Sequence, residues 1–255
     1  MQDVQFNYAG KNFVVVGASS GIGKQIALEL AQAGANVLCM ARRVEIIEKL
    51  KEFQGEGKIY PAHIDVTKAT AKDWDAALKN FVGEVGKING GVYTAGVSGF
   101  TPLRQWNEEL ANQIMDTSYW GMVRFIQSAT KKRFANDGSA FVTFSSTAAY
   151  AGNQGVLVYA SAKAAVQTAV KVIAREISQN NHRINSVSPG WVEDTGMTNA
   201  HEEEFPKPDA EKDFLLGSGT VEKVSGIVLF LLSEKANWIT GRDIVIDGGQ
   251  LIVGG

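Results

Sequence analysis

The stretch NFVVVGASSGIGKQIALELAQAGA, residues 12–35, decides the fold class. Residues 12–18 form a continuous apolar run rich in β-branched side chains, which is typical of a buried strand. Apolar residues then recur at helical spacing from Ile22 to Leu30, and Gly34 ends the pattern. This order predicts a strand, a glycine-rich turn and a helix, which together form the first unit of an α/β protein.

The rest of the chain repeats this alternation of apolar runs and helical patterns. The predicted strands cover residues 36–41, 58–66, 90–95, 140–145, 183–188 and 243–247, and the predicted helices cover 44–53, 70–83, 107–135, 158–178 and 220–233. Strands that are apolar on both faces and separated by helices are typical of a parallel sheet covered on both sides. We therefore predict a single Rossmann-type α/β domain over residues 1–255. Its doubly wound parallel sheet should bind ligands at the carboxyl ends of the strands.

One polar segment, residues 193–217, interrupts the alternation and holds two of the five prolines in the chain. Long insertions at the ligand-bearing edge of such a sheet often cover the substrate. We expect this segment to act as a substrate loop or lid.

Composition narrows the classes of partner. The 255 residues are 45% hydrophobic and 20% charged, with a formal net charge of -2, which excludes a disordered chain and gives no basis for nucleic-acid binding. The single cysteine, Cys39, stands in an apolar run and is expected in the core. The N-terminus lacks a secretory pattern, and the apolar run 226–232 is too short to cross a bilayer, so we expect a cytoplasmic protein with no membrane partner.

The turn after the first strand contains Gly17, Gly21 and Gly23. Glycine lets a backbone turn tightly and approach a pyrophosphate, and the free N–H groups at the start of the following helix attract that anion. The spacing is G-x-x-x-G-x-G and differs from the G-x-G-x-x-G fingerprint. Taken alone, the turn fits either a nucleotide site or a tight connection.

The second predicted strand is followed by Arg42 and Arg43, where NAD-binding Rossmann domains carry an acidic residue for the ribose 2′-hydroxyl. Two cations beside the start of a helix are unfavourable unless an anion binds there. A 2′-phosphate is such an anion, so the pair favours NADP(H) over NAD(H).

Tyr159 and Lys163 stand four residues apart in the predicted helix 158–178, so they share one face of that helix. An ammonium beside a phenol stabilises the phenolate and lowers its pKa from about 10, which suits a general acid or base. A solvated surface pair has the same spacing, so the spacing by itself leaves both interpretations open.

In the order and spacing of its motifs, the chain resembles the short-chain dehydrogenase/reductase family over essentially its whole length. The motifs that carry the resemblance are GASSGIG at 17–23, HIDV at 63–66, YASAK at 159–163, SVSPGWVEDTGM at 186–197 and ITGRDIVIDGG at 239–249. Members that resemble 3-oxoacyl carrier-protein reductase are one candidate assignment, and a steroid, sugar or polyol substrate is equally open. The resemblance implies hydride transfer between a nicotinamide cofactor and a small-molecule ketone or secondary alcohol.

The motifs and the resemblance together give one set of predicted cofactor-binding residues. These are Gly17, Ser19, Ser20, Gly21, Ile22, Gly23, Arg42, Arg43, Asp65, Val66, Ala95, Gly96, Tyr159, Lys163, Pro189, Gly190, Val192 and Thr195.

The resemblance also implies the catalytic roles. Tyr159 would exchange a proton with the substrate oxygen, and Lys163 would lower the tyrosine pKa and bind the nicotinamide ribose. Ser146, thirteen residues before Tyr159, is preferred over Ser145 as the residue that orients the substrate carbonyl.

The chain departs from the family pattern in two segments. The family's Asn-Asn-Ala-Gly reads YTAG here, with Tyr93 and Thr94 in place of both amides. The family's catalytic asparagine, three residues before a glycine, corresponds to Ser118, although Thr117 and Asp116 are adjacent alternatives. Serine is shorter and has one donor in place of two, so a catalytically weakened dinucleotide-binding sensor or scaffold is the alternative function.

The remaining expectations concern tryptophans, histidines and assembly. Trp106, Trp120 and Trp191 are expected either in the substrate pocket or in the core. The histidines, His63, His182 and His201, are scattered, and no metal site is expected. The apolar C-terminal tail, residues 243–255, would be exposed in a monomer, so we predict a homotetramer or homodimer.

Overall fold

The computed structural model describes residues 4–52, 55–193, 195–199 and 208–253. Its centre is a seven-stranded parallel sheet in the order β3-β2-β1-β4-β5-β6-β7. The strands are β1 (Asn12–Val16), β2 (Asn36–Ala41), β3 (Lys58–His63), β4 (Ile88–Tyr93), β5 (Ala135–Phe144), β6 (Arg183–Pro189) and β7 (Asp243–Ile246). This order reverses direction between β1 and β4 and confirms the predicted Rossmann-type sheet.

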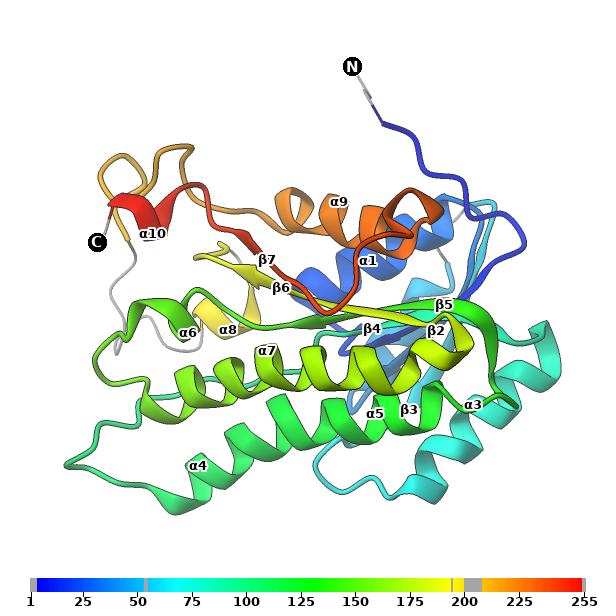
Figure 1. The fold of residues 1–255 in the computed structure, drawn as a ribbon, viewed down its shortest axis with the longest axis horizontal. Helices are drawn as coiled ribbons and strands as arrows, with labels where there is room; N and C mark the ends of the chain where they lie inside the picture. Colours follow the sequence, from blue (N-terminus) through cyan, green and yellow to red (C-terminus); the bar gives the residue numbers. More distant parts are fainter. Residues whose placement is uncertain (1–3, 53–54, 194, 200–207, 254–255) are drawn as a thin grey trace.

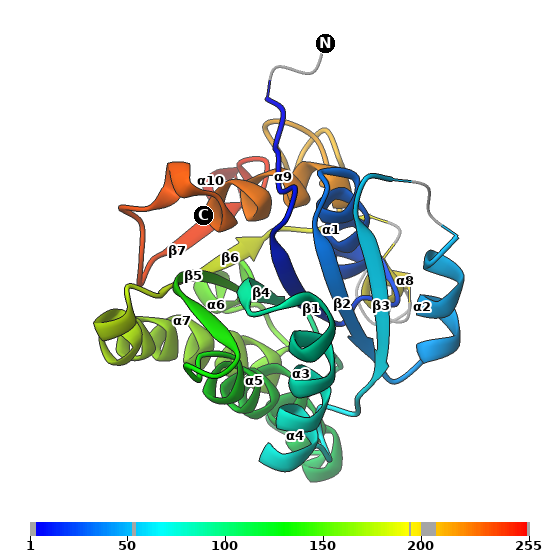
Figure 2. The ribbon, with the colours of Figure 1, turned by 90° about the vertical axis from the view of Figure 1, so that its right-hand side faces the viewer.

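Helices cover both faces of the sheet (Figures 1 and 2). They are α1 (Gly21–Gln32), α2 (Val44–Leu50), α3 (Ala71–Val85), α4 (Glu108–Met115), α5 (Gly121–Ala129), α6 (Ala148–Ala151), α7 (Leu157–Ile177), α8 (Gly196–Asn199), α9 (Val221–Leu232) and α10 (Gln250–Val253), with a π-helix η1 (Asp116–Trp120) and 3-10 turns η2 (Ser178–Asn180) and η3 (Glu234–Ala236). Helices α1 and α9 lie side by side on one face, and α3, α5 and α7 lie on the other. The sheet is therefore shielded from water on both sides, as its apolar strands require.

Several element boundaries differ from the prediction. The single helix expected over 107–135 is broken by η1 and ends at Ala129, where the Thr130 hydroxyl donates to the Ile126 carbonyl. Strand β5 begins at Ala135, five residues earlier than expected, with Gly138 in the left-handed region at φ +80°. The first strand ends at Val16, because Gly17 turns the chain at φ +90°.

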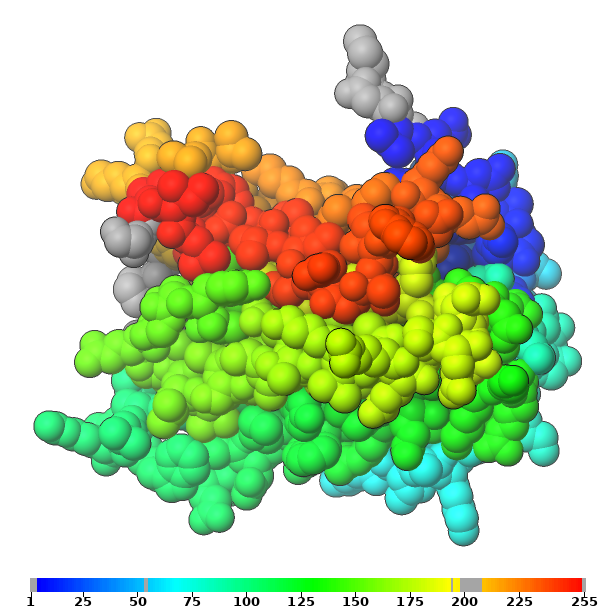
Figure 3. Space-filling view, viewed as in Figure 1, coloured from blue at the N-terminus to red at the C-terminus, as the bar shows by residue number. Residues whose placement is uncertain are grey.

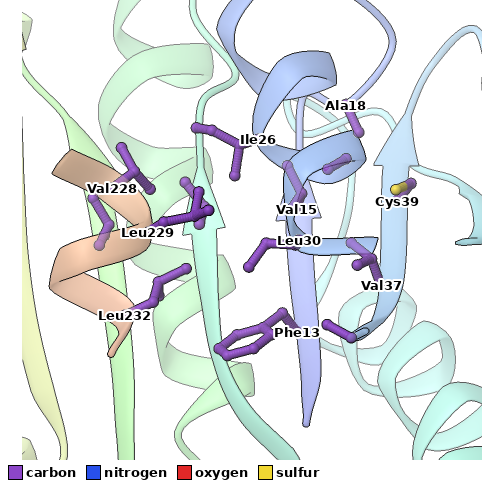
Figure 4. Close-up of a cluster of buried hydrophobic side chains, with 14 of the residues drawn as sticks. Phe13, Val15, Ala18, Ile26, Leu30, Val37, Cys39, Val228, Leu229 and Leu232 are labelled. Carbon is purple, nitrogen blue, oxygen red and sulfur yellow. The ribbon is translucent and has the colours of Figure 1, made fainter. Parts of the chain in front are cut away.

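The core has two large clusters, one on each face of the sheet. Figure 4 shows the cluster between α1 and α9, where Leu30 and Leu229 point toward each other above the strands. Phe13 and Val15 of β1 close it from below, and Cys39 lies in it as expected. Because α1 also carries the glycine turn, this packing fixes the position of that turn.

Helix α7 with η2, residues Leu157–Asn180, is long and apolar enough to cross a bilayer by length and composition alone. Core helices of globular domains meet the same criterion. Here Ala162, Val166 and Val170 are fully buried, and the two valines pack in the cluster under the sheet. The helix is therefore part of the Rossmann layer in this fold.

We predict that Leu30→Ala lowers the free energy of unfolding by about 2–5 kcal/mol, because it leaves a cavity between α1 and α9. The matched change Leu103→Ala, at a side chain that is 80% exposed, should cost less than about 0.5 kcal/mol. Urea unfolding followed by circular dichroism measures both values. Equal losses in the two variants would contradict the packing described here.

Candidate active site

A cavity of about 820 Å³ opens at the carboxyl ends of the strands, the edge at which the fold predicts ligands. All of the residues predicted to bind the cofactor line it, from Gly17 in the first turn to Thr195 beyond β6. Ser146 lines it as well. The structure thus brings together motifs that are up to 178 positions apart in the sequence.

Gly17 and Gly23 pack directly against Thr94 at the end of β4. A Cβ on Gly17 would stand 2.6 Å from the Thr94 Oγ1, and one on Gly23 would stand 2.3 Å from the same atom and 2.4 Å from the Gly17 carbonyl. Thr94 Oγ1 itself donates to the Val16 carbonyl at 2.8 Å. Glycine is therefore required at both positions by close approach of β4, which explains the observed spacing of the turn.

Helix α1 presents an uncapped N-terminus to this cavity. Ser20 is the N-cap residue, but its side chain makes no capping hydrogen bond. The first-turn residues Gly21, Ile22 and Gly23 line the cavity, and a Cβ on Gly21 would come within 3.6 Å of the Thr195 side chain. Unpaired N–H groups at a helix start bind phosphate, so the turn fits the pyrophosphate of a dinucleotide.

The two arginines lie at one end of the cavity. Arg43 Nη2 is 3.4 Å from both the Ser19 and the Ser20 hydroxyl oxygens, and Arg42 lines the same end. Burial alone would raise the pKa of Asp65, but hydrogen bonds from Thr67 and the charges of Arg42 and Lys68 hold it below its usual value. This end of the cavity therefore offers cations to a phosphate.

Tyr159, Ser146 and Lys163 meet at the other end. The Ser146 side chain hydrogen-bonds Tyr159, and its oxygen also accepts from the Ala148 N–H at 3.2 Å. Lys163 Nζ donates to the Phe144 carbonyl at 2.9 Å. Ser145, the rejected alternative, is buried and donates to the Lys163 carbonyl at 2.9 Å. The two serines thus have different contacts: Ser146 faces Tyr159, and the hydrogen bond of Ser145 links the end of β5 to α7.

The expected lowering of the Tyr159 pKa is not found. Burial raises the pKa of Tyr159, and the hydrogen bond with Ser146 only partly opposes this. Burial also lowers the pKa of Lys163 to about 8. The ammonium lies 5.6 Å from the centre of the Tyr159 ring and is held by the Phe144 carbonyl, so desolvation outweighs the attraction between the two groups.

The substrate side of the cavity includes residues that the sequence did not reveal. Met197 Sδ accepts a long hydrogen bond from Tyr159 Oη at 3.8 Å, and Gln250 Oε1 accepts from the Trp191 N–H at 3.2 Å. Further lining residues are Thr94, Val97, Ser98, Thr147, Ala148, Asn153, Val156 and Pro208. Trp191 was expected at the site, and Met197 and Pro208 lie in the predicted substrate segment 193–217, whereas no sequence pattern indicated Gln250.

Other candidate residues lie elsewhere. Trp106 and Trp120 are 55% and 46% exposed and line neither the cavity nor the core, so both interpretations of them were wrong. Ser118 is buried just behind the cavity, whereas its neighbour Thr117 lines it. Of the segment 193–217, residues 194 and 200–207 lie outside the described residues, and His201 is among them. Over the described ranges, His, Cys, Asp and Glu form no cluster able to hold a metal.

A family model described as enoyl-(acyl carrier protein) reductase matches residues 17–250, from the glycine turn to the start of α10. The chain belongs to the short-chain dehydrogenase/reductase family. It is accordingly a NAD(P)-dependent enzyme that acts on CH–OH or C=O groups.

Relatives in this family cover almost the whole chain. The 3-oxoacyl-(acyl-carrier-protein) reductase FabG of Staphylococcus aureus is 30% identical over 245 residues, which are 94% of this chain and 98% of that protein. The enzyme of the same name from Thermotoga maritima is 32% identical over 246 residues, or 95% and 98% of the two chains. Among solved structures, a short-chain type dehydrogenase/reductase from Mycobacterium marinum matches with a TM-score of 0.84 at 32% identity, covering 96% of this chain and 97% of that one.

The low pKa of Lys163 has a consequence for stability. Between about pH 8 and the ordinary lysine pKa of 10.5, Lys163 binds a proton in the unfolded chain that it has lost in the folded chain, so the contribution of Lys163 to stability rises with pH across this window. We predict that Lys163→Met loses this contribution, so that between pH 7.5 and 10.5 its stability gains less, or falls more, than that of the wild type, whereas Lys171→Met, at an exposed position of the same helix, follows the wild type. Urea unfolding at pH 7.5, 9 and 10.5 tests this, and the same change with pH in Lys163→Met as in the wild type would refute it.

Proposed function

We propose that this chain is an NADP-dependent oxidoreductase that reduces a ketone or oxidises a secondary alcohol, with Tyr159 as the general acid or base. The observation that carries the proposal is the convergence of Tyr159, Ser146 and Lys163 on a cavity whose other end holds the glycine turn and two arginines. When bound, the nicotinamide would supply or accept the hydride.

The side chains of this site can supply everything else that carbonyl reduction needs. The raised pKa of Tyr159 keeps its hydroxyl protonated, as a proton donor to the substrate oxygen requires. Ser146, hydrogen-bonded to Tyr159, is placed to hold that oxygen as negative charge develops on it. Lys163 lies 5.6 Å from the centre of the Tyr159 ring and can replace the lost proton, because its own pKa is near 8.

The substrate would enter where Met197 contacts Tyr159. Val97, Val156, Trp191 and Met197 give this end of the cavity an apolar wall. The names of the Staphylococcus and Thermotoga relatives point to 3-oxoacyl thioesters as the first substrate class to test. Short ketones with an apolar tail share this chemistry.

A homodimer or homotetramer stays our prediction. The C-terminal residues and the segment before α9 meet at one end of the molecule (Figure 3), where Leu215 donates its N–H to the Gly248 carbonyl. Leu216, Ile252 and Val253 are exposed there. An apolar edge of this kind is typical of a subunit interface.

A cytoplasmic location also remains a prediction, supported by the single, buried cysteine.

We predict that Arg42→Ala weakens NADPH binding by about tenfold or more while NADH binding changes less than about twofold, because only NADPH carries the 2′-phosphate. Arg43→Ala should act in the same direction. Arg133→Ala, whose side chain pairs with Asp75 far from the cavity, is the control. Fluorescence titration gives both dissociation constants, and NADH binding as tight as NADPH binding in the wild type would remove the NADP assignment.

Tyr159→Phe should reduce the rate of carbonyl reduction by about a hundredfold or more, because the proton donor is lost while the ring remains. NADPH binding should change less than about threefold. Steady-state assays with a panel of 3-oxoacyl thioesters and simple ketones measure the rate. Tight nucleotide binding without reduction of any carbonyl by the wild type would instead favour a sensor or scaffold.

A further inference from the structure

The helix that carries Ser118 contains a π-turn at the active site. Helices α4 and α5 are joined by η1, residues Asp116–Trp120. In a regular α-helix the Gly121 N–H would donate to the Thr117 carbonyl, but here it donates to the Asp116 carbonyl. The Thr117 carbonyl is thereby released from its α-helical partner.

Tyr93 donates a hydrogen bond to the Thr117 carbonyl that the π-turn leaves free. Its hydroxyl, on the last residue of β4, donates to the Thr117 carbonyl at 2.6 Å. Gly121 makes room for it, since a Cβ there would stand 2.2 Å from Tyr93 Oη. The Tyr93 ring is buried and packs against Phe125 of α5, with ring centres 6.0 Å apart. Tyr93 therefore contacts the π-turn through one hydrogen bond, and ring packing against Phe125 fixes the position of the Tyr93 side chain.

The π-turn sets where Ser118 lies relative to Lys163. A Cβ on Gly96 would stand 3.5 Å from Lys163 Nζ and 3.8 Å from Ser118 Oγ, so both polar atoms border the same small space. Ser118 Oγ is buried and has no hydrogen-bond partner within the described part of the chain. Buried hydroxyl groups are normally paired, so this atom is suited to a bound water that links it to Lys163.

We propose that Tyr93 is a positioning residue for proton delivery: by holding the Thr117 carbonyl, it keeps the π-turn open and Ser118 beside Lys163. This rests on the proposed function, in which Lys163 returns the proton to Tyr159. Burial raises the pKa of the Tyr93 hydroxyl and so keeps it protonated. The positive charge of Arg124 lowers this pKa, but by less than burial raises it, so Tyr93 acts as a donor throughout the working pH range.

The test compares Tyr93→Phe, Ser118→Ala and the double variant. Tyr93→Phe keeps the ring and its packing, so the protein should fold and bind NADPH with a dissociation constant within about twofold of wild type. We expect kcat to fall by about tenfold in each single variant and no further in the double variant, because both changes break one path. The pH profile of kcat should shift equally in all three.

Two results would overturn the proposal. One is an unchanged kcat and pH profile in Tyr93→Phe. The other is a kcat loss that multiplies with that of Ser118→Ala, which would show that Tyr93 supports the fold without acting through Ser118.

A readout without turnover separates this proposal from the proposed function. In protein labelled with 13C-lysine, NMR titration gives the pKa of Lys163, assigned by its absence in Lys163→Met. Loss of the nearby oxygen should lower this pKa from about 8, and by the same amount in Tyr93→Phe as in Ser118→Ala. Tyr159 is the titratable side chain that faces Lys163, so the titration is repeated in Tyr159→Phe. If no carbonyl is reduced but the two shifts agree, the proposed function fails and the positioning role stands; a shift in Ser118→Ala alone overturns the positioning role.

Discussion

Two side chains at the carboxyl end of β4 hold the parts of the site together. Thr94 Oγ1 bonds the last carbonyl of β1, so tightly that only glycine fits at positions 17 and 23 of the facing turn. Tyr93, one residue earlier, points to the opposite face of the strand and bonds the Thr117 carbonyl in the π-turn. The glycine turn on one face and the helix near Lys163 on the other are thus fixed by adjacent residues. These are the two positions at which the chain departs from the family's paired asparagines.

The proposed mechanism depends on Lys163, a lysine whose burial disfavours its charged form. Lys163 is 4% exposed and its ammonium is held by a backbone carbonyl, so its proton is weakly bound compared with that of a surface lysine. A lysine with a pKa of about 8 can return a proton to Tyr159, whose own pKa is raised, after Tyr159 has given its proton to the substrate. Burial therefore has opposite effects on the two groups: it keeps Tyr159 protonated as a donor, and it makes Lys163 release its proton more easily.

Local sequence patterns predicted what is set locally or by strand order. The apolar run before Gly17 placed the sheet edge, and the spacing of Tyr159 and Lys163, read together with the family resemblance, placed the two polar side chains at one cavity. The roles of Met197 and Gln250 were not predicted, because the helices that carry them, α8 and α10, have only four residues each and are too short to show a periodic pattern. The direction of the Tyr159 pKa was missed for a related reason: i and i+4 spacing brings side chains near each other but does not show how deeply they are buried. The break at Asp116–Trp120 depends on Tyr93, a partner 23 residues before it, and helical periodicity does not contain that information.

The most direct test of the central claim is to follow the hydride itself. NADPH deuterated at C4 of the nicotinamide, prepared as each of the two stereoisomers, would be incubated with the protein and a 3-oxoacyl thioester or an apolar ketone. We predict that one stereoisomer transfers a single deuterium to the carbinol carbon of the product, detected by mass spectrometry, and that Tyr159→Phe slows this transfer by about a hundredfold or more. Saturating NADPH binding with no deuterium in any product would contradict an oxidoreductase built on this site.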